Sequence, residues 1–379
     1  MRLSDGLYDI LKDTLRWNKP RLQCFISLLG ALLQVQQMDL SRLVQAMNDN
    51  AQLQSRYRRL QRFFQMTHFD YDAIAHLIMG MFAFDQGHFY LTLDRTNWKW
   101  GRKNINLLVI AVAYKGIAIP IYWLVLNKQG NSNQRERIAL LHRFIAQFGS
   151  TPIQAILGDR EFIGQQWWAA MSLHSIPFLM RMRENQHYKD KRSIGRPMSQ
   201  LFRDLMPGES RTLRKSRHIS DQSIYLSAMR LPSGELLILA ANQRIAKPFD
   251  VYARRWEIET LFQALKGRGF NMEATRITHY FRIKKVVALL AIAFCWAHKT
   301  GEWRHDHVKA LKLKNHGRLE KSQFRYGLDY LADKLFTPVI SPQEVMRLLV
   351  LFLCPPHWIQ SGQSDFPIKV CGHNLTGAI

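Results

Sequence analysis

The chain has 379 residues, with 53 Lys+Arg against 29 Asp+Glu and a formal net charge of +24. This excess of positive charge favours a polyanionic partner such as nucleic acid. Because 47% of the residues are hydrophobic and the basic residues are interleaved with them, the composition excludes a disordered basic tail. The length indicates two or three folded domains.

The apolar and cysteine patterns disfavour other classes of protein. The longest apolar run, Val286 to Ala297, is too short to span a bilayer, so no membrane partner is expected. The 4 cysteines form no CxxC pair, which supports neither a disulfide framework nor a zinc site and indicates the cytoplasm. The charged, amphipathic start indicates no signal peptide. The sequence contains no Gly-rich loop followed by Lys-Ser or Lys-Thr, so ATP use is not indicated.

Residues 1–82 show only helical periodicity and are predicted to form a helical region. The segment SRYRRLQRFF, which begins at Ser55, is rich in arginine. Arg58, Arg59 and Arg62 are candidates for contacts with DNA phosphates. The alternative for any one of them is a solvated face of a helical bundle.

Residues 83–182 change to short strands. The runs FYLTLD, INLLVIAVAY and IAIPIYWLVL are separated by short turns, which makes them antiparallel neighbours. A helix, a fourth strand, a second helix and a fifth strand are predicted next. The order β-β-β-α-β-α-β is the plan of a ribonuclease H-like core, a mixed α/β sheet with helices on both faces.

Residues 183–245 interrupt this core with a basic, β-rich insertion. Its runs YLSAMRL and ELLILAAN are joined by Pro-Ser-Gly and are predicted to form a hairpin. Residues 246–300 return to the core as its second part. Residues 301–379 are predicted to be a helical, basic C-terminal region.

The segment VYARRWEIETLFQALKGRGF, from Val251, predicts a helix with two different sides. At about 100° per residue, Arg255, Glu259 and Lys266 fall within about 60° of Tyr252. The far side can be buried and carries Ile258, Leu261, Phe262 and Leu265. A carboxylate flanked by two cations and a phenol suits a metal-binding acid beside a phosphate, with a solvated face as the alternative.

Two aspartates are predicted to end neighbouring strands, Asp94 the first and Asp159 the fourth. With Glu259 from the helix, their oxygens suit Mg²⁺ or Mn²⁺. Two such ions could activate a water or a 3′-hydroxyl at a phosphodiester. Glu161 and Glu257 compete for the third position. Glu161 is too close to Asp159 to come from a separate element, and Glu257 points off the polar stripe, which favours Glu259.

These motifs resemble those of the DDE transposases of bacterial insertion sequences. That group carries a Tyr-x2-Arg-x3-Glu-x6-Lys signature, which stands here as Tyr252, Arg255, Glu259 and Lys266. The strings LDRTNW around Asp94 and GDREF around Asp159 match the family in context and order. The similarity covers residues from about 88 to 330.

The resemblance implies cut-and-paste transposition in the bacterial cytoplasm, on the nucleoid. Such an enzyme binds double-stranded terminal inverted repeats, pairs them in a homodimeric synaptic complex, and cleaves and joins them to target DNA with two Mg²⁺ ions. The N-terminal region would read the repeat, the insertion would cover the cleavage site, and the C-terminal helices would help pair subunits.

The resemblance also assigns roles to individual residues. It implies that Asp94, Asp159 and Glu259 bind metal. The residues that it assigns to phosphates near the transposon end are Tyr252, Arg255 and Lys266.

A hairpin step follows less directly from the resemblance. Related hairpin-forming members carry a base-stacking tryptophan in the insertion, and residues 183–245 contain none. Trp256 matches a second tryptophan of those relatives and is the candidate partner of a nucleotide pulled out of the stack; packing beneath the helix is the alternative. Two other functions stay open, a ribonuclease H-like endonuclease without strand transfer and a non-catalytic DNA-binding regulator.

Overall fold

The computed structural model describes residues 2–47, 51–189, 194–315, 317–336 and 340–354, with the backbone of 369–370 and 373–374. The chain forms two compact units. The helical unit comprises Met1–Gln86, Trp98–Lys103 and Phe262–Ile379, and the sheet unit comprises Gly87–Asn97 and Asn104–Leu261. Among the described residues, no helix is both long and apolar enough to cross a lipid bilayer.

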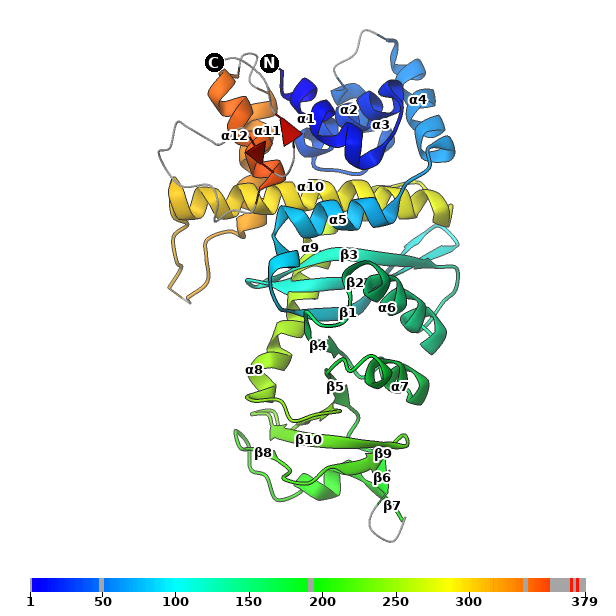
Figure 1. The fold of residues 1–379 in the computed structure, drawn as a ribbon, viewed down its shortest axis with the longest axis vertical. Helices are drawn as coiled ribbons and strands as arrows, with labels where there is room; N and C mark the ends of the chain where they lie inside the picture. Colours follow the sequence, from blue (N-terminus) through cyan, green and yellow to red (C-terminus); the bar gives the residue numbers. More distant parts are fainter. Residues whose placement is uncertain are drawn as a thin grey trace. The chain divides into compact units, whose positions relative to one another are not determined.

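The helical unit begins with a helical bundle (Figure 1). Its elements are α1 (Leu3–Leu15), α2 (Lys19–Val35), α3 (Leu40–Ala46), α4 (Leu53–Met66), α5 (Tyr71–Met81) and η1 (Phe84–Gln86). The Asn18 side chain accepts from the backbone N–H of Arg21 at the start of α2, and Asp70 does the same for Asp72 and Ala73 at the start of α5. These caps satisfy donors that a helix leaves unpaired.

The C-terminal part of the helical unit is organised by α10. The elements are η4 (Met272–Ala274), α10 (Tyr280–His307), α11 (Gln323–Phe336), α12 (Pro342–Leu353), β12 (Lys369–Val370) and β13 (His373–Asn374). A Cβ on Gly301 would lie 1.7 Å from the carbonyl oxygen of Gln323, and one on Gly327 would lie 1.8 Å from that of Ala297. The two glycines therefore let α10 and α11 pack backbone against backbone. α10 also runs through residue 300, where the sequence placed a boundary.

The sheet unit is built on a mixed sheet. Its first strands and helices are β1 (Phe89–Trp100), β2 (Lys103–Tyr114), β3 (Ile117–Leu126), α6 (Gln134–Phe148), β4 (Ile153–Gly158), α7 (Gln165–Leu173) and β5 (Phe178–Met182). The strands lie in the order β3-β2-β1-β4-β5. β2 and β3 are antiparallel, whereas β1 with β4 and β4 with β5 are parallel. This arrangement confirms the predicted mixed sheet, with its five core strands in the predicted chain order.

The insertion extends this sheet. Its elements are β6 (His187–Lys189), β7 (Gly195–Pro197), η2 (Met198–Phe202), β8 (Ser210–Thr212), β9 (Arg217–Ile219), β10 (Gln222–Arg230) and β11 (Leu236–Ala241). The predicted hairpin is confirmed as β10 with β11. Because β11 also pairs with β5, the sheet continues as β5-β11-β10-β9-β6-β7, with β8 on β10. Figure 1 shows these strands following one another, with α6 and α7 on the right.

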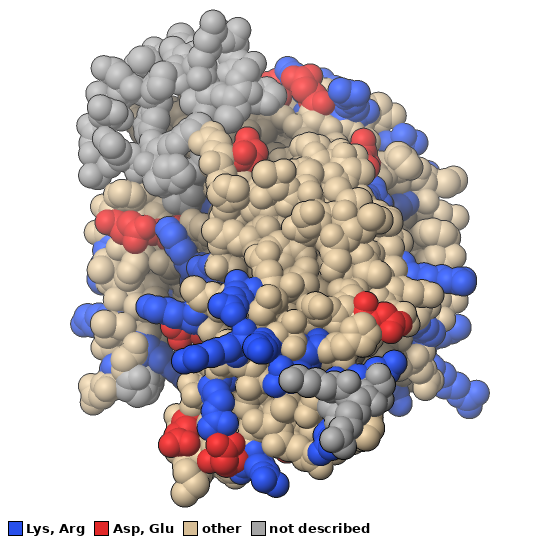
Figure 2. All heavy atoms as spheres, turned by 60° about the horizontal axis from the view of Figure 1, so that its bottom comes forward, with Lys and Arg blue, Asp and Glu red and all other residues tan. Residues whose placement is uncertain are grey.

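The surface reflects the basic composition of the chain. On the face drawn in Figure 2, Lys and Arg side chains outnumber those of Asp and Glu. The interior of the sheet unit is apolar, with Trp167, Trp168 and Phe144 fully buried on α7 and α6. The apolar core and the charged surface of this unit are thus separated, as in other folded domains.

Candidate functional site

Asp94 and Asp159 are brought side by side by the pairing of β1 with β4. The last matched positions of the parallel register are Leu93 and Gly158, so the two aspartates follow on adjacent strands. The sequence prediction that Asp94 ends its strand was wrong, because β1 continues to Trp100. The strand is prolonged by its pairing with β2 on the other side.

The local backbone fixes each aspartate. The N–H of Arg95 donates to Asp94 Oδ1 at 2.7 Å, and the N–H of Arg160 donates to Asp159 Oδ1 at 2.6 Å. Each carboxylate thus uses one oxygen on the following peptide. The second oxygen of each is left for other partners.

The segment that carries Glu259 is not the single helix that the sequence predicted. It consists of α8 (Pro248–Ala253), the 3₁₀ turn η3 (Arg254–Trp256) and α9 (Glu257–Leu265). Arg255 and Glu259 nevertheless form the i,i+4 ion pair expected of one helix face. The predicted apolar side is confirmed as buried, at Ile258, Leu261, Phe262 and Leu265.

Arg255 joins two of the three acids. Its Nη1 donates to Asp94 Oδ2 at 3.2 Å, and its Nη2 donates to Glu259 Oε1 at 2.8 Å. The Arg255 side chain is 6% exposed, against 18% for Asp94 and 36% for Glu259. A buried cation therefore holds a strand carboxylate and a helix carboxylate at short range.

The third acid, Asp159, affects the pKa of Asp94 through its charge. The pKa of Asp94 is raised to about 6, chiefly by burial. The N–H of Arg95 and the charge of Arg255 lower this pKa, whereas the charges of Asp159 and Glu259 contribute to raising it. The three carboxylates thus share one electrostatic environment. Among the described residues, however, no three His, Cys, Asp or Glu side chains are already arranged to hold a metal ion.

Glu161, one of the two competing glutamates, is engaged in structural contacts. Arg95 donates to it through Nε and Nη2, each at 3.1 Å, and the Ser132 hydroxyl donates at 3.2 Å. These contacts tie the turn after β4 to β1 and to the start of α6. Glu161 is therefore occupied as an anchor of this turn.

Glu257 is buried on the other side of the segment. It accepts hydrogen bonds from the backbone N–H groups of Tyr114 and Gly116, at the turn between β2 and β3. Burial raises the pKa of its carboxyl, and Arg254 lowers it. Glu257 fastens the start of α9 to this turn, so it is the less suitable of the two helix carboxylates for the acid cluster.

Tyr252 lies in the core, although the sequence placed it on an exposed stripe. It is 5% exposed and packs in a cluster with Ala155, Leu157, Leu179, Leu239 and Ala241. Burial raises the pKa of its phenol well above the ordinary value. The centroid of the Tyr252 ring lies 6.0 Å from the Arg255 guanidinium carbon, so the buried ring packs beside Arg255.

Trp256 has the opposite environment. It is 56% exposed, and the Arg255 guanidinium carbon lies 4.4 Å from its ring centroid. The alternative that Trp256 packs beneath the helix is therefore wrong. Its ring is available to a partner next to the acid cluster.

Lys266 is the last residue of the Tyr-Arg-Glu-Lys signature. It follows the end of α9, belongs to the helical unit, and forms an ion pair with Glu273 at 2.8 Å. The prediction of one unbroken helix from Tyr252 to Lys266 was wrong, because the segment contains the 3₁₀ turn η3 and α9 ends at Leu265.

The candidate arginines of α4 differ in exposure. Arg58 and Arg62 are exposed, whereas Arg59 is half-buried. Arg56, in the same segment, donates to the carbonyl groups of Val44 and Met47 and so holds the end of α3. Arg58 and Arg62 are therefore the more accessible of the three candidate arginines.

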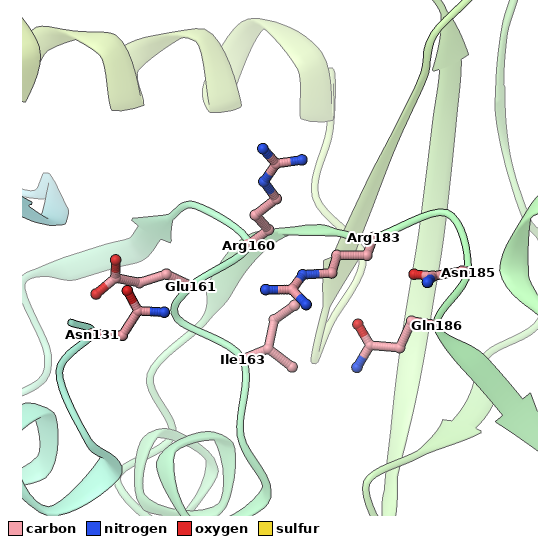
Figure 3. Close-up of a pocket in the computed structure, with 7 residues that line it drawn as sticks. All are labelled: Asn131, Arg160, Glu161, Ile163, Arg183, Asn185 and Gln186. Atoms are coloured by element: carbon pink, nitrogen blue, oxygen red, sulfur yellow. The ribbon is translucent and has the colours of Figure 1, made fainter.

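A pocket of about 350 Å³ lies beside Asp159. Its lining, drawn in Figure 3, consists of Asn131, Arg160, Glu161, Ile163, Arg183, Asn185 and Gln186. Figure 3 shows Arg183 reaching from the end of β5 toward Ile163. In the described part of the chain, the guanidinium groups of Arg160 and Arg183 have no ion-pair partner. Sequence reasoning missed Arg183, although a residue just after β5 is expected at the same sheet edge as one just after β4.

Comparison with known proteins identifies the family of the chain. The model of the transposase DDE domain matches residues 83–296, more than half of the chain. A solved piggyBac transposase synaptic complex with hairpin DNA is similar at 12% identity and a TM-score of 0.42, over 96% of this chain and 86% of that one. A search of curated proteins found no match. The chain belongs to the transposase DDE domain family.

Proposed function

We propose that the chain catalyses cut-and-paste transposition of an insertion sequence. It binds double-stranded terminal inverted repeats, cuts the DNA at the ends of the element and joins those ends to target DNA. Membership of the transposase DDE domain family supports this activity. The observation that carries it is the convergence of Asp94 on β1, Asp159 directly after β4 and Glu259 on α9 in one electrostatic environment.

The donor set fits a hard divalent cation. Three carboxylates supply the oxygen ligands that Mg²⁺ prefers, with Mn²⁺ as a substitute. Asp94 and Glu259 already hold one cationic group between them, the Arg255 guanidinium. We assign Asp94, Asp159 and Glu259 as the metal ligands. Two bound ions would activate a water or a 3′-hydroxyl and stabilise the leaving oxygen.

Positive groups beside the acids are suited to the phosphates of the substrate. Arg255 lies among the acids, and Arg160 directly follows Asp159 and is exposed. The Tyr252 ring packs beside Arg255. Lys266, directly after α9, is assigned as a further phosphate contact. An arginine presents several donors in a planar fork that matches phosphate oxygens. These residues position the scissile strand.

Cleavage through a hairpin is the route that we favour. A hairpin needs a nucleotide to leave the stack, at a cost of a few kcal/mol. Stacking on the exposed ring of Trp256 can return about 1–3 kcal/mol. The pocket of about 350 Å³ beside Asp159 offers Arg183 and amide groups to such a nucleotide.

The remaining regions have supporting roles in this proposal. Residues 1–82 read the terminal repeat, with Arg58, Arg59 and Arg62 on its phosphates. Residues 183–245 cover the cleavage site, and residues 301–379 help pair two copies in the synaptic complex. The reaction takes place on the bacterial chromosome, in the cytoplasm.

A strand-transfer assay tests the proposal. The purified chain is incubated with Mg²⁺, a plasmid target and a duplex ending in the inverted repeat found beside its gene. We expect the duplex to be joined to the plasmid. Cutting without joining would identify a ribonuclease H-like endonuclease, and binding without cutting would identify a non-catalytic regulator.

A further inference from the structure

Three consecutive aromatic side chains are exposed in the helical unit, which contains none of the three acids. His279, Tyr280 and Phe281 lie at the start of α10, and Tyr280 and Phe281 are 38% and 58% exposed. The rings of Tyr280 and Phe281 are 4.1 Å apart, and those of His279 and Tyr280 are 5.3 Å apart. Clustered apolar surface of this kind marks a contact with a partner.

A pocket of about 180 Å³ adjoins this aromatic group. It is bounded by the start of α3, one face of α4 and the segment before α10. Tyr57 and Gln61 line it from α4, and Arg276, His279 and Arg282 line it from the other side. The pocket thus joins the aromatic group to the basic helix α4.

The surroundings of the pocket carry uncompensated positive charge. Two arginines line it, and three more directly follow lining residues in the sequence: Arg276, Arg282, Arg42, Arg58 and Arg62. Within the described part of the chain, none of these five side chains forms an ion pair. The lining acid, Asp39, is engaged in capping α3 through the N–H groups of Ser41 and Arg42.

We propose that these five arginines and the three aromatic residues form one aromatic-arginine surface that binds duplex DNA. The arginines contact phosphates, and Tyr280 and Phe281 lie against the faces of bases at a kinked step, as apolar side chains do in other DNA complexes. Charge selects this partner, since a second copy of a chain with net charge +24 would oppose positive with positive. The choice of DNA rests on the proposed function.

The arginine contribution is tested with a matched pair of variants. Arg276→Gln removes a charge from the surface, and Arg21→Gln removes an exposed arginine of α2 in the same unit. The affinity of each for a fluorescent random-sequence duplex is measured by anisotropy over a range of salt. Arg276→Gln is expected to weaken binding and to flatten the slope of log affinity against log salt by about 0.9, with no change for Arg21→Gln.

The aromatic contribution has a different signature. The double variant Tyr280→Ala/Phe281→Ala keeps every charge, so we expect the salt slope to stay unchanged while affinity falls about fivefold or more. Both side chains are exposed, so its melting temperature is expected to match that of the natural chain.

Three results would overturn the inference. If the natural chain binds the duplex and all variants bind equally well, the surface is wrong while the proposed function stands. If the double variant changes only the oligomeric state, a second copy occupies the surface. If the natural chain does not bind DNA at all, the proposed function and this inference fail together.

Discussion

The guanidinium of Arg255 donates to the carboxylate of Asp94 at 3.2 Å, although the two residues lie 161 positions apart in the sequence. The same guanidinium donates to Glu259, so one buried cation bridges two acids of the candidate site. The acids are therefore assembled by the fold of the sheet unit itself.

Replacing Arg255 with Leu tests this role. We expect the free energy of unfolding without metal to fall by about 1.5–3 kcal/mol, because Asp94 is left without its charged hydrogen-bond donor. Arg254→Leu is the control, since Arg254 is 42% exposed and its ion pair with Glu257 is long, at 3.8 Å. Its effect on the free energy of unfolding is expected to stay within about 0.5 kcal/mol. Equal effects in urea unfolding would contradict the bridge.

Trp256→Ala is expected to separate two steps of the reaction. The first nick should be nearly intact, because Trp256 is exposed and not a core residue. Hairpin formation should slow, since the extruded nucleotide has no ring to stack on, and an abasic nucleotide near the end should partly restore it. Gel analysis of the two products is the measurement. Equal loss of both steps with a lowered melting temperature would show a structural role.

The arginines of α4 are predicted to have two different roles, in DNA binding and in stability. Changing Arg58, Arg59 and Arg62 together to Ala should flatten the salt dependence of binding to the terminal repeat, by about 0.9 for each phosphate that the variant no longer neutralises. Arg56→Ala should instead lower the melting temperature, because Arg56 holds the carbonyl groups of Val44 and Met47. An unchanged slope and affinity in the triple variant would place the repeat-binding surface elsewhere.

The contact between α10 and α11 is predicted to depend on glycine. Gly301→Ala should destabilise the helical unit strongly, because the added Cβ would lie 1.7 Å from the Gln323 carbonyl oxygen. Gly30→Ala is the matched control, since nothing lies within 4 Å of its added Cβ in α2, and it should stabilise by about 1 kcal/mol. Thermal unfolding is the measurement. The same shift in melting temperature for both variants would refute this packing.

The sheet was predictable because its strands have clear alternating or apolar runs and short turns. The pairing of β1 with β4 follows from the order of those runs, so the proximity of Asp94 and Asp159 was also within reach of the sequence. The residue at which β1 ends could not be predicted, because β1 still pairs with β2 after β4 has ended.

The helix that carries Glu259 was only partly predictable. Ideal helical angles find the Arg255–Glu259 pair, but they cannot foresee the 3₁₀ turn at Arg254–Trp256. They also cannot show which side of Tyr252 is covered, because its burial comes from residues of β4, β5 and β11 that are distant in the sequence. The pocket beside Asp159 depends in the same way on β5 reaching the sheet edge of β4.

The most direct test of the acid cluster compares three glutamates with the two aspartates in one strand-transfer assay with Mg²⁺. We expect Asp94→Asn, Asp159→Asn and Glu259→Gln to bind the transposon end but neither to cut nor to join it. Glu257→Gln and Glu161→Gln, at carboxylates engaged elsewhere in the fold, should keep both steps whenever they remain folded. An active Glu259→Gln beside a folded but inactive Glu257→Gln would contradict the assignment.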